Sequence, residues 1–231
     1  MHLIRPTVHK VLLNKDITEL FHANSVLTAC QFVKRNSLLS RGTVERNGFK
    51  QTTQTSDKID KLFSLWFDVF ADTVDIHHRG RMANIYGPIL FVIDTNILEN
   101  ISLGRIWVTK CNPTKWTGLP ENERWFQNKA DLEENLTKGT FDQMIVFRHS
   151  GGEIPLGKYL KIIVVDDPGY ELSGQIDMYS MAIGALMLAM NESGVEVPIE
   201  RRVCRPNCTC ENYYSSDLTR LVRMYSPSKN D

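Results

Sequence analysis

Phe-Asp-Gln-Met-Ile-Val-Phe, at residues 141–147, is the stretch that decides the fold of this chain. Two polar residues, Asp142 and Gln143, precede a run of apolar and β-branched residues, which is the pattern of a buried strand with a polar entry. Similar apolar runs, bounded by Gly, Pro or Asn, occur at residues 86–94, 106–110 and 159–165. With residues 141–148 these runs predict four central strands.

The spacing of apolar residues also predicts helices, over residues 25–33, 61–76, 130–136 and 176–190. Residues 7–15 read as a short helix or strand, residues 38–45 as a strand ending in a Gly turn, and residues 46–60 as a polar loop. Strands and helices do not alternate regularly, so the sequence favours an α+β fold over a doubly wound sheet.

We predict one domain over residues 1–200 and a Cys-containing appendage, residues 201–231, packed on it. Lys+Arg and Asp+Glu both number 27. A formal net charge of zero excludes a broadly basic nucleic-acid-binding protein, although a local basic groove remains compatible with it. No apolar run is long enough to cross a bilayer, and the N-terminus lacks the plan of a signal peptide. We therefore expect a cytoplasmic protein with reduced thiols and no membrane partner.

A cysteine cluster lies near the C-terminus. Cys204, Cys208 and Cys210 have C-x3-C-x-C spacing, which in a reduced protein suggests a structural zinc ion on one tight turn. A closed zinc site needs four ligands. The candidates for the fourth are Cys111, Cys30 and a histidine. The alternative is a turn with free thiols.

Two elements near the N-terminus offer side chains suited to a nucleotide. His22 follows an apolar pair and stands two residues before Asn24. An imidazole can donate to or accept from a ribose hydroxyl. Ser40 and Arg41 follow a second apolar pair, and the donor fork of an arginine suits a pyrophosphate. A core histidine and an exposed turn arginine are the alternative interpretations.

Two further elements follow. Residues 68–86 mix acidic, His and Arg residues, Arg79 and Arg81 among them, before a Tyr86-Gly-Pro turn. Gln143 then stands at the head of its strand. The acidic and His residues of the loop could also bind a metal, but the chain has no H-E-x-x-H motif.

In this order, the four elements resemble the DarT-like ADP-ribosyltransferases, over residues 20–165. The resemblance implies an ADP-ribosyltransferase-like split β-sheet core with flanking helices, and NAD as the substrate. It implies catalytic roles for Gln143 and Arg81. The residues that it implies for NAD binding are His22, Asn24, Ser40, Arg41 and Tyr86.

Gln143 stands where the resemblance places a catalytic Glu. The transferase reaction breaks the bond between nicotinamide and ribose through an oxocarbenium-like state, whose positive charge a carboxylate stabilises. An amide keeps the shape but not the charge. The chain is therefore either a natural variant or an inactive form, and Gln143→Glu is predicted to raise transfer.

Members of the DarT-like family modify bases in nucleic acid and act as toxins or in phage defence. The resemblance thus implies a single-stranded nucleic acid, DNA or RNA, as partner, and an antitoxin protein as a second partner. The basic loop with His78, Arg79 and Arg81 is the candidate contact surface.

Two other functions compete with the transferase. Phe-Val-Ile-Asp-Thr-Asn-Ile-Leu, at residues 91–98, resembles the opening strand of PIN-domain ribonucleases, which gather carboxylates around Mg²⁺ or Mn²⁺. The candidate metal ligands are Asp94, Glu133 or Glu134, Asp166 and Asp177. The third hypothesis is a zinc-stabilised protein that binds a partner through the cysteine cluster.

Overall fold

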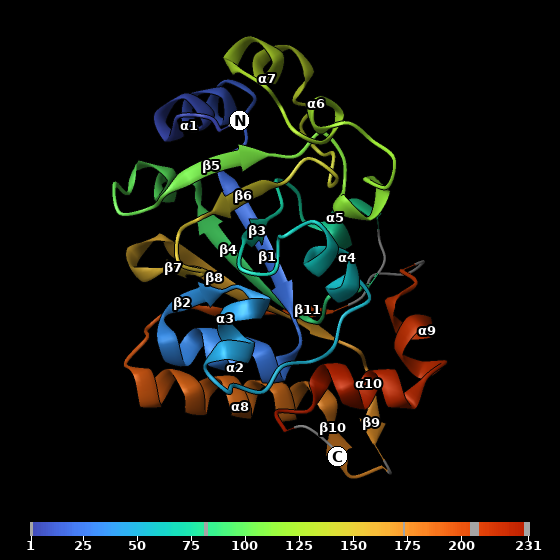
Figure 1. Ribbon diagram of the computed structural model, residues 1–231. Coiled ribbons are helices and arrows are strands. Elements are labelled where there is room, and N and C mark those ends of the chain that lie inside the picture. Colours follow the sequence, from blue (N-terminus) through green and yellow to red (C-terminus); the bar gives the residue numbers. More distant parts are fainter. Residues whose placement is uncertain (1, 81–82, 173, 204–207, 229–231) are drawn as a thin grey trace.

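Two larger β-sheets form the centre of the computed structural model, which describes residues 2–80, 83–172, 174–203 and 208–228 (Figure 1). The first sheet has the order β1 (Glu19–Asn24), β4 (Ile89–Asp94), β8 (Leu160–Asp167), β11 (Ile199–Val203). The second has the order β3 (Val69–Ala71), β6 (Ile145–Arg148), β5 (Arg105–Val108). Only the β8–β11 pair is parallel in these two sheets as described.

The two sheets meet at their edge strands. Phe21 of β1 and Asp72, just after β3, exchange both backbone hydrogen bonds, with N···O distances of 2.9 and 2.7 Å. This single bridge holds the end of β3 beside the middle of β1. Side chains from both sheets can therefore point into one space, and the core is a split sheet.

Helices flank the split sheet. They are α1 (Arg5–Asn14), α2 (Val26–Arg35), α3 (Arg41–Arg46), α4 (Asp57–Leu62), α5 (Ile76–Gly80), α6 (Glu121–Arg124), α7 (Lys129–Asn135), α8 (Met178–Ser193), α9 (Cys210–Ser215) and α10 (Leu218–Tyr225). Figure 1 shows α2, α8 and α10 together below the first sheet, and α1 with α7 near β5 at the other end. The prediction of an α+β fold with flanking helices is confirmed. Two short antiparallel pairs complete the strands described: β2 (Ser37–Leu39) with β7 (Glu153–Pro155), and β9 (Glu171–Leu172) with β10 (Ile176–Asp177).

The end of α2 directs the chain towards the candidate site. Asn36 has a φ of 47°, the left-handed conformation that commonly ends a helix, and Lys34 and Arg35 occupy the last turn, where cations are favoured. The chain then forms β2, which pairs with β7. Ser40 follows β2 at once and caps α3, its Oγ accepting from the backbone N–H of Thr43 at 3.1 Å. Arg41 is consequently fixed at the first position of α3.

Two elements differ from the prediction. The helix predicted over residues 61–76 is wrong: α4 ends at Leu62, Ser64 takes a left-handed φ of 59°, and β3 follows. The apolar spacing matched a helix, but the hydrogen-bond partner of Val69 is Phe147, far along the chain. Residues 38–45 form a strand only up to Leu39, because the cap at Ser40 starts α3.

The predicted central strands are present, as β4, β5, β6 and β8, with bounds that differ from the prediction by one to four residues at each end that changes. In particular, β6 begins at Ile145, so Gln143 precedes the strand rather than opening it. The predicted helices over 25–33, 130–136 and 176–190 correspond to α2, α7 and α8, and residues 7–15 overlap α1. None of the helices described is both long and apolar enough to cross a bilayer.

The C-terminal segment shares the main core. β11 crosses the predicted domain boundary at residue 200 and pairs with β8. Beyond it, Tyr214, Leu221 and Tyr225 are fully buried within the same apolar cluster as β4 and β8. The Tyr225 hydroxyl donates to the backbone oxygen of Asp166 at 2.7 Å. The described part of the segment thus adds a strand to the first sheet and packs its helices into the same core.

Candidate functional site

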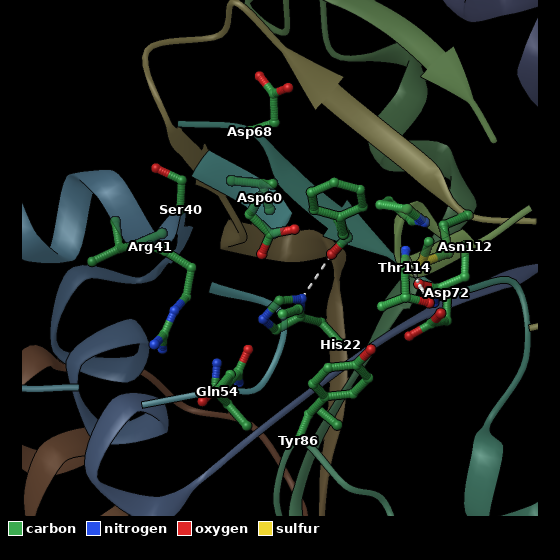
Figure 2. A pocket seen from close by; sticks show the side chains of 18 residues that line it. His22, Ser40, Arg41, Gln54, Asp60, Asp68, Asp72, Tyr86, Asn112 and Thr114 are labelled. Carbon is green, nitrogen blue, oxygen red and sulfur yellow. Dashed lines mark hydrogen bonds between the residues drawn. The ribbon is translucent and has the colours of Figure 1, made fainter. Parts of the chain in front are cut away.

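A cavity of about 100 Å³, open to solvent, lies where β1 and β3 meet. Figure 2 shows the side chains that line it. They are His22, Ala23, Asn24, Leu39, Ser40, Arg41, Gln54, Ser56, Asp60, Asp68, Val69, Phe70, Asp72, Tyr86, Asn112, Pro113, Thr114 and Met144. The five residues predicted to bind NAD are all among them.

His22 stands at the centre of the cavity with one ring nitrogen committed (Figure 2). Its Nδ1 lies 2.7 Å from the backbone oxygen of Phe70, and a carbonyl can only accept, so Nδ1 carries the hydrogen. Burial lowers the pKa of His22, outweighing the raising effect of that hydrogen bond, so the ring is neutral near pH 7. Nε2 is buried and without a partner in the structure. It is therefore an acceptor available to a ligand hydroxyl.

Arg41 is held by Asp57. Its Nε and Nη2 donate to the two Asp57 carboxylate oxygens at 3.0 and 2.8 Å, and both side chains are largely buried. The third nitrogen, Nη1, is buried and has no partner in the structure. A guanidinium fixed on one edge and open on another can donate to an oxyanion without losing further side-chain entropy. The Ser40 hydroxyl, in contrast, is already occupied by the α3 cap.

Asn24 and Tyr86 shape the floor of the cavity. The Asn24 Oδ1 accepts from the backbone N–H of Ser25 at 3.0 Å. Gly87 has a φ of +147°, and a Cβ built on it would lie 2.1 Å from the carbonyl carbon of Asn24. The turn before β4 therefore packs directly on the β1 backbone, which brings Tyr86 beside His22. Burial raises the pKa of Tyr86 to about 12, so its phenol stays neutral.

Three aspartates line the cavity. Burial raises the pKa of Asp68, which forms an ion pair with Arg148 at 2.8 Å. Burial raises the pKa of Asp60 to about 6. Burial, with repulsion from Asp75 and Asp142, raises the pKa of Asp72 to about 8. Strongly raised carboxyl pKa values within one cleft mark it as a candidate reaction site.

Arg41 and Asp72 lie on opposite sides of His22 in Figure 2. Asp72 is grouped there with Asn112 and Thr114, while Arg41 is beside Ser40. The cavity therefore has an arginine paired with Asp57 on one side and the carboxyl of Asp72 on the other, with the neutral acceptor of His22 between them. A dipolar ligand with an anionic middle and a cationic head would match this arrangement.

Gln143 does not line the cavity, although its neighbour Met144 does. Its Oε1 accepts from the backbone N–H of Thr137 at 2.7 Å, and its Nε2 donates to the backbone oxygen of Asn135 at 3.1 Å. Both ends of the buried amide are thus used to hold the chain after α7. The predicted convergence of His22, Arg41 and Gln143 in one cleft is met by the first two only.

Asp142 lies near the cavity, although the next residue, Gln143, does not line it. Its carboxylate is paired with Lys115, which directly follows the lining residue Thr114. Its charge also raises the pKa values of Asp72 and Tyr86. Residues 141–144 are not in a strand, so the alternation of side chains between two faces does not place Asp142 opposite Gln143.

The remaining predicted residues lie elsewhere. Arg81 and Cys204 lie outside the described residues. Cys208 and Cys210 gather instead around His77 of α5, and all three ligand atoms lie within 4.8 Å of one another. Arg79 is exposed, with its guanidinium 5.3 Å from the ring centre of Phe141.

The carboxylates proposed for a PIN-like ribonuclease do not converge. Asp94 ends β4, whereas Asp166 donates its backbone N–H to Pro88 before the start of that strand. At about 3.4 Å per residue, the length of β4 separates them by roughly 17 Å. Asp177 is used as the cap of α8. The metal cluster of that hypothesis is contradicted for these residues.

Sequence reasoning did not assign Asp60, Asp68, Asp72 or Asn112 to the NAD-binding site. The acidic residues stand within a segment that was read as loop and helix. The only sequence signal was the recurrence of Asp before the Tyr86-Gly-Pro turn, and nothing in it distinguished a buried from an exposed carboxyl. The position of Asp72 depends on the backbone bridge to Phe21, which no local pattern predicts.

No protein-family model matches the chain, and no curated protein matches it significantly. Among solved structures, the chain is similar to Thermus sp. 2.9 DarT in complex with ADP-ribosylated single-stranded DNA. The match covers 81% of this chain and 95% of that chain, with a TM-score of 0.47 and 10% sequence identity. A likeness of this size carries no argument for function, so any function has to be argued from the cavity itself.

Proposed function

We propose that the cavity binds NAD and that the chain is an ADP-ribosyltransferase. One observation carries the proposal. Five residues chosen from scattered sequence elements, residues 22 to 86, line a single cavity. Two of them, His22 and Arg41, each present one buried polar atom that has no protein partner. Buried polar atoms normally have partners, so these two point to a ligand.

The polarity of the cavity fits the polarity of NAD. Arg41 Nη1 would donate to the pyrophosphate, and His22 Nε2 would accept from a hydroxyl of the nicotinamide ribose. The positively charged nicotinamide ring would then lie towards Asp72. A nearby positive charge favours the ionised carboxyl, so binding would lower the raised pKa of Asp72.

We further propose that Asp72, rather than Gln143, is the catalytic carboxylate. Breaking the bond to nicotinamide leaves positive charge on the ribose, and an anionic oxygen aimed at that carbon stabilises it. Asp72 lines the cavity, whereas the Gln143 amide is committed to Asn135 and Thr137. On this proposal the chain is an active enzyme and not an inactive form. A catalytic role for Gln143 stays a prediction, and label transfer by Gln143→Glu tests it.

The proposed acceptor is a base in single-stranded nucleic acid, DNA or RNA. His78 and Arg79 are exposed on α5, and Arg79 lies over the ring of the partly exposed Phe141. Phe141 adjoins Asp142 near the side of the cavity where Asp72 lies. A basic side chain next to an exposed aromatic ring is the combination used to track a strand and stack its bases.

A transferase that modifies bases would be harmful to the cell that makes it. We therefore propose a toxin role in phage defence, with an antitoxin protein as partner. The toxin role holds only if the chain modifies bases in nucleic acid.

The test combines NAD binding with label transfer. The purified chain is incubated with adenylate-labelled NAD and single-stranded DNA or RNA oligonucleotides. Asp72→Asn should lower transfer by on the order of a hundredfold, which is far more than it weakens NAD binding. His22→Ala and Arg41→Gln should weaken NAD binding itself.

Two controls accompany these variants. Glu133→Gln changes an exposed carboxylate on α7 and should leave both measurements unchanged. Gln143→Glu decides between the two carboxylate positions, since raised transfer would return the catalytic role to Gln143. Absence of NAD binding by the unmodified chain in calorimetry would overturn the proposed function.

A further inference from the structure

A second cluster of reactive side chains lies away from the cavity, between α5 and the start of α9. The Cys208 Sγ lies 3.9 Å from His77 Nε2 and 2.9 Å from the Cys210 Sγ. His77 and Cys210 are buried, 8% and 2% exposed. We propose that His77, Cys208 and Cys210, with their thiols reduced, supply three of the ligands of a zinc ion that fastens the C-terminal segment to α5.

The spacing of the ligand atoms is close to that of a tetrahedral site. From the usual Zn–S and Zn–N lengths, a sulfur and a nitrogen bound to one zinc ion lie roughly 3.6 Å apart, and two sulfurs roughly 3.8 Å apart. The distance between Cys208 Sγ and His77 Nε2 already matches. The two sulfurs would separate by roughly 0.9 Å, within reach of a cysteine side-chain rotation.

The environment of His77 is the second observation that points to a metal. Its Nδ1 lies 3.6 Å from Asp166 Oδ2, and both of these buried atoms lack a hydrogen-bond partner. A metal-binding histidine commonly turns its other ring nitrogen to a carboxylate, which orients the ring and raises its basicity. His77 therefore has a ligand nitrogen facing the sulfurs and an orienting carboxylate behind it.

A disulfide at Cys210 is the competing state, because Cys210 is disulfide-bonded in the structure, whereas the Cys208 thiol is free. Reduction of a disulfide to two thiols takes two electrons and two protons, which a phosphine reductant supplies. Zinc then displaces the thiol protons as it binds the thiolates. The metal would also use a third ligand, His77, whose Nε2 faces the sulfurs, whereas a disulfide makes no use of this nitrogen.

The site would stiffen the segment that carries the proposed reaction centre. His77 follows Asp72 by five residues and precedes Tyr86 by nine. Arg202 of β11 donates to both Asp166 and Asp75, which ties the same loop to the first sheet. A zinc ion at His77 would add a second tie beside this one. The proposal does not depend on NAD binding.

The test measures zinc in protein purified with a phosphine reductant and without chelator. About one zinc ion per chain is expected by mass spectrometry of the metal. His77→Gln and Cys208→Ser should lose most of it. His78→Gln and Cys111→Ser are matched controls outside the cluster and should keep it. His77→Cys should retain zinc, because a thiolate replaces the lost ligand, whereas a purely packing role would not be rescued.

Replacement of zinc by Co²⁺ gives an independent readout, since thiolate-to-cobalt absorption bands should appear and should be weakened by Cys208→Ser. Circular dichroism confirms that each variant is folded. The proposal is overturned by zinc-free protein under these conditions, by zinc content unchanged in His77→Gln, or by a Cys210 disulfide that persists after reduction, detected by thiol alkylation and mass measurement.

Discussion

At the scale of single residues, the buried carboxyl of Asp72 makes stability depend on pH. Burial raises its pKa to about 8, so the folded state binds this proton more tightly than the unfolded chain does. The stabilisation is complete below pH 4 or so and is lost as the pH rises through about 8. Asp72→Asn should therefore stabilise the protein at pH 9 relative to pH 4, by on the order of 5 kcal/mol, because the pKa rises from 3.8 to about 8.

Urea unfolding at the two pH values measures this difference. Asp177→Asn is a suitable comparison, because the Ser180 side chain lowers the pKa of Asp177 by hydrogen bonding, and its removal should not stabilise the protein at high pH. A pH profile for Asp72→Asn that parallels the unmodified chain would show that Asp72 is ionised in the folded state.

Gln143 supplies the second prediction at this scale. In Gln143→Glu, a carboxylate oxygen would replace the amide nitrogen that donates to Asn135, and two acceptors would face each other in a buried place. We expect a loss of about 1–3 kcal/mol in the free energy of unfolding, with no gain in transfer. Gln175→Glu makes the same change at an exposed position and should be nearly neutral. Denaturant unfolding of both variants gives the comparison.

At the scale of elements, the turn before β4 decides whether β1 and Tyr86 stand side by side. Gly87→Ala would place a Cβ 2.1–2.3 Å from backbone atoms of Asn24 and Ser25, and neither strand can move without breaking the β1–β4 ladder. We expect a loss of roughly 3 kcal/mol or more in stability.

Gly48→Ala is the matched control for this turn. Gly48 also has a positive φ, +68°, but nothing lies within 4 Å of the added Cβ. Only the left-handed strain remains, so the cost should be about 1 kcal/mol. Thermal unfolding of the two variants separates close packing from backbone strain, and equal losses would show that the turn is not packed on β1.

At the scale of the whole molecule, Arg202 joins three parts that are distant in sequence. It extends from β11 to Asp166 of β8 and to Asp75 before α5. Asp166 is only 2% exposed, so Arg202→Met would leave an uncompensated charge in the core. We expect a loss of about 3–5 kcal/mol, measured by urea unfolding. Lys161→Met removes an exposed ion pair with Glu19 and should cost less than about 1 kcal/mol.

The sequence by itself determined most of the strands and helices, and it selected five residues that line the cavity. Apolar periodicity reports which face of an element is buried, and the His22, Ser40-Arg41 and Tyr86-Gly-Pro elements are local patterns of a few residues. Both kinds of pattern depend only on residues that are close together in the sequence. They can therefore be recognised without knowledge of the fold.

Only the tertiary structure decided which carboxylate faces the cavity and which histidine faces the cysteines. Asp72 owes its place to the bridge with Phe21, and the strand before it pairs with β6, more than seventy residues away. His77 meets Cys208 across an even longer separation. Gln143 stands at the position of the catalytic residue in the family motif, but both ends of its amide form hydrogen bonds with the backbone. Burial, raised pKa values and ligand geometry all arise from contacts between distant segments, and a linear pattern does not contain them.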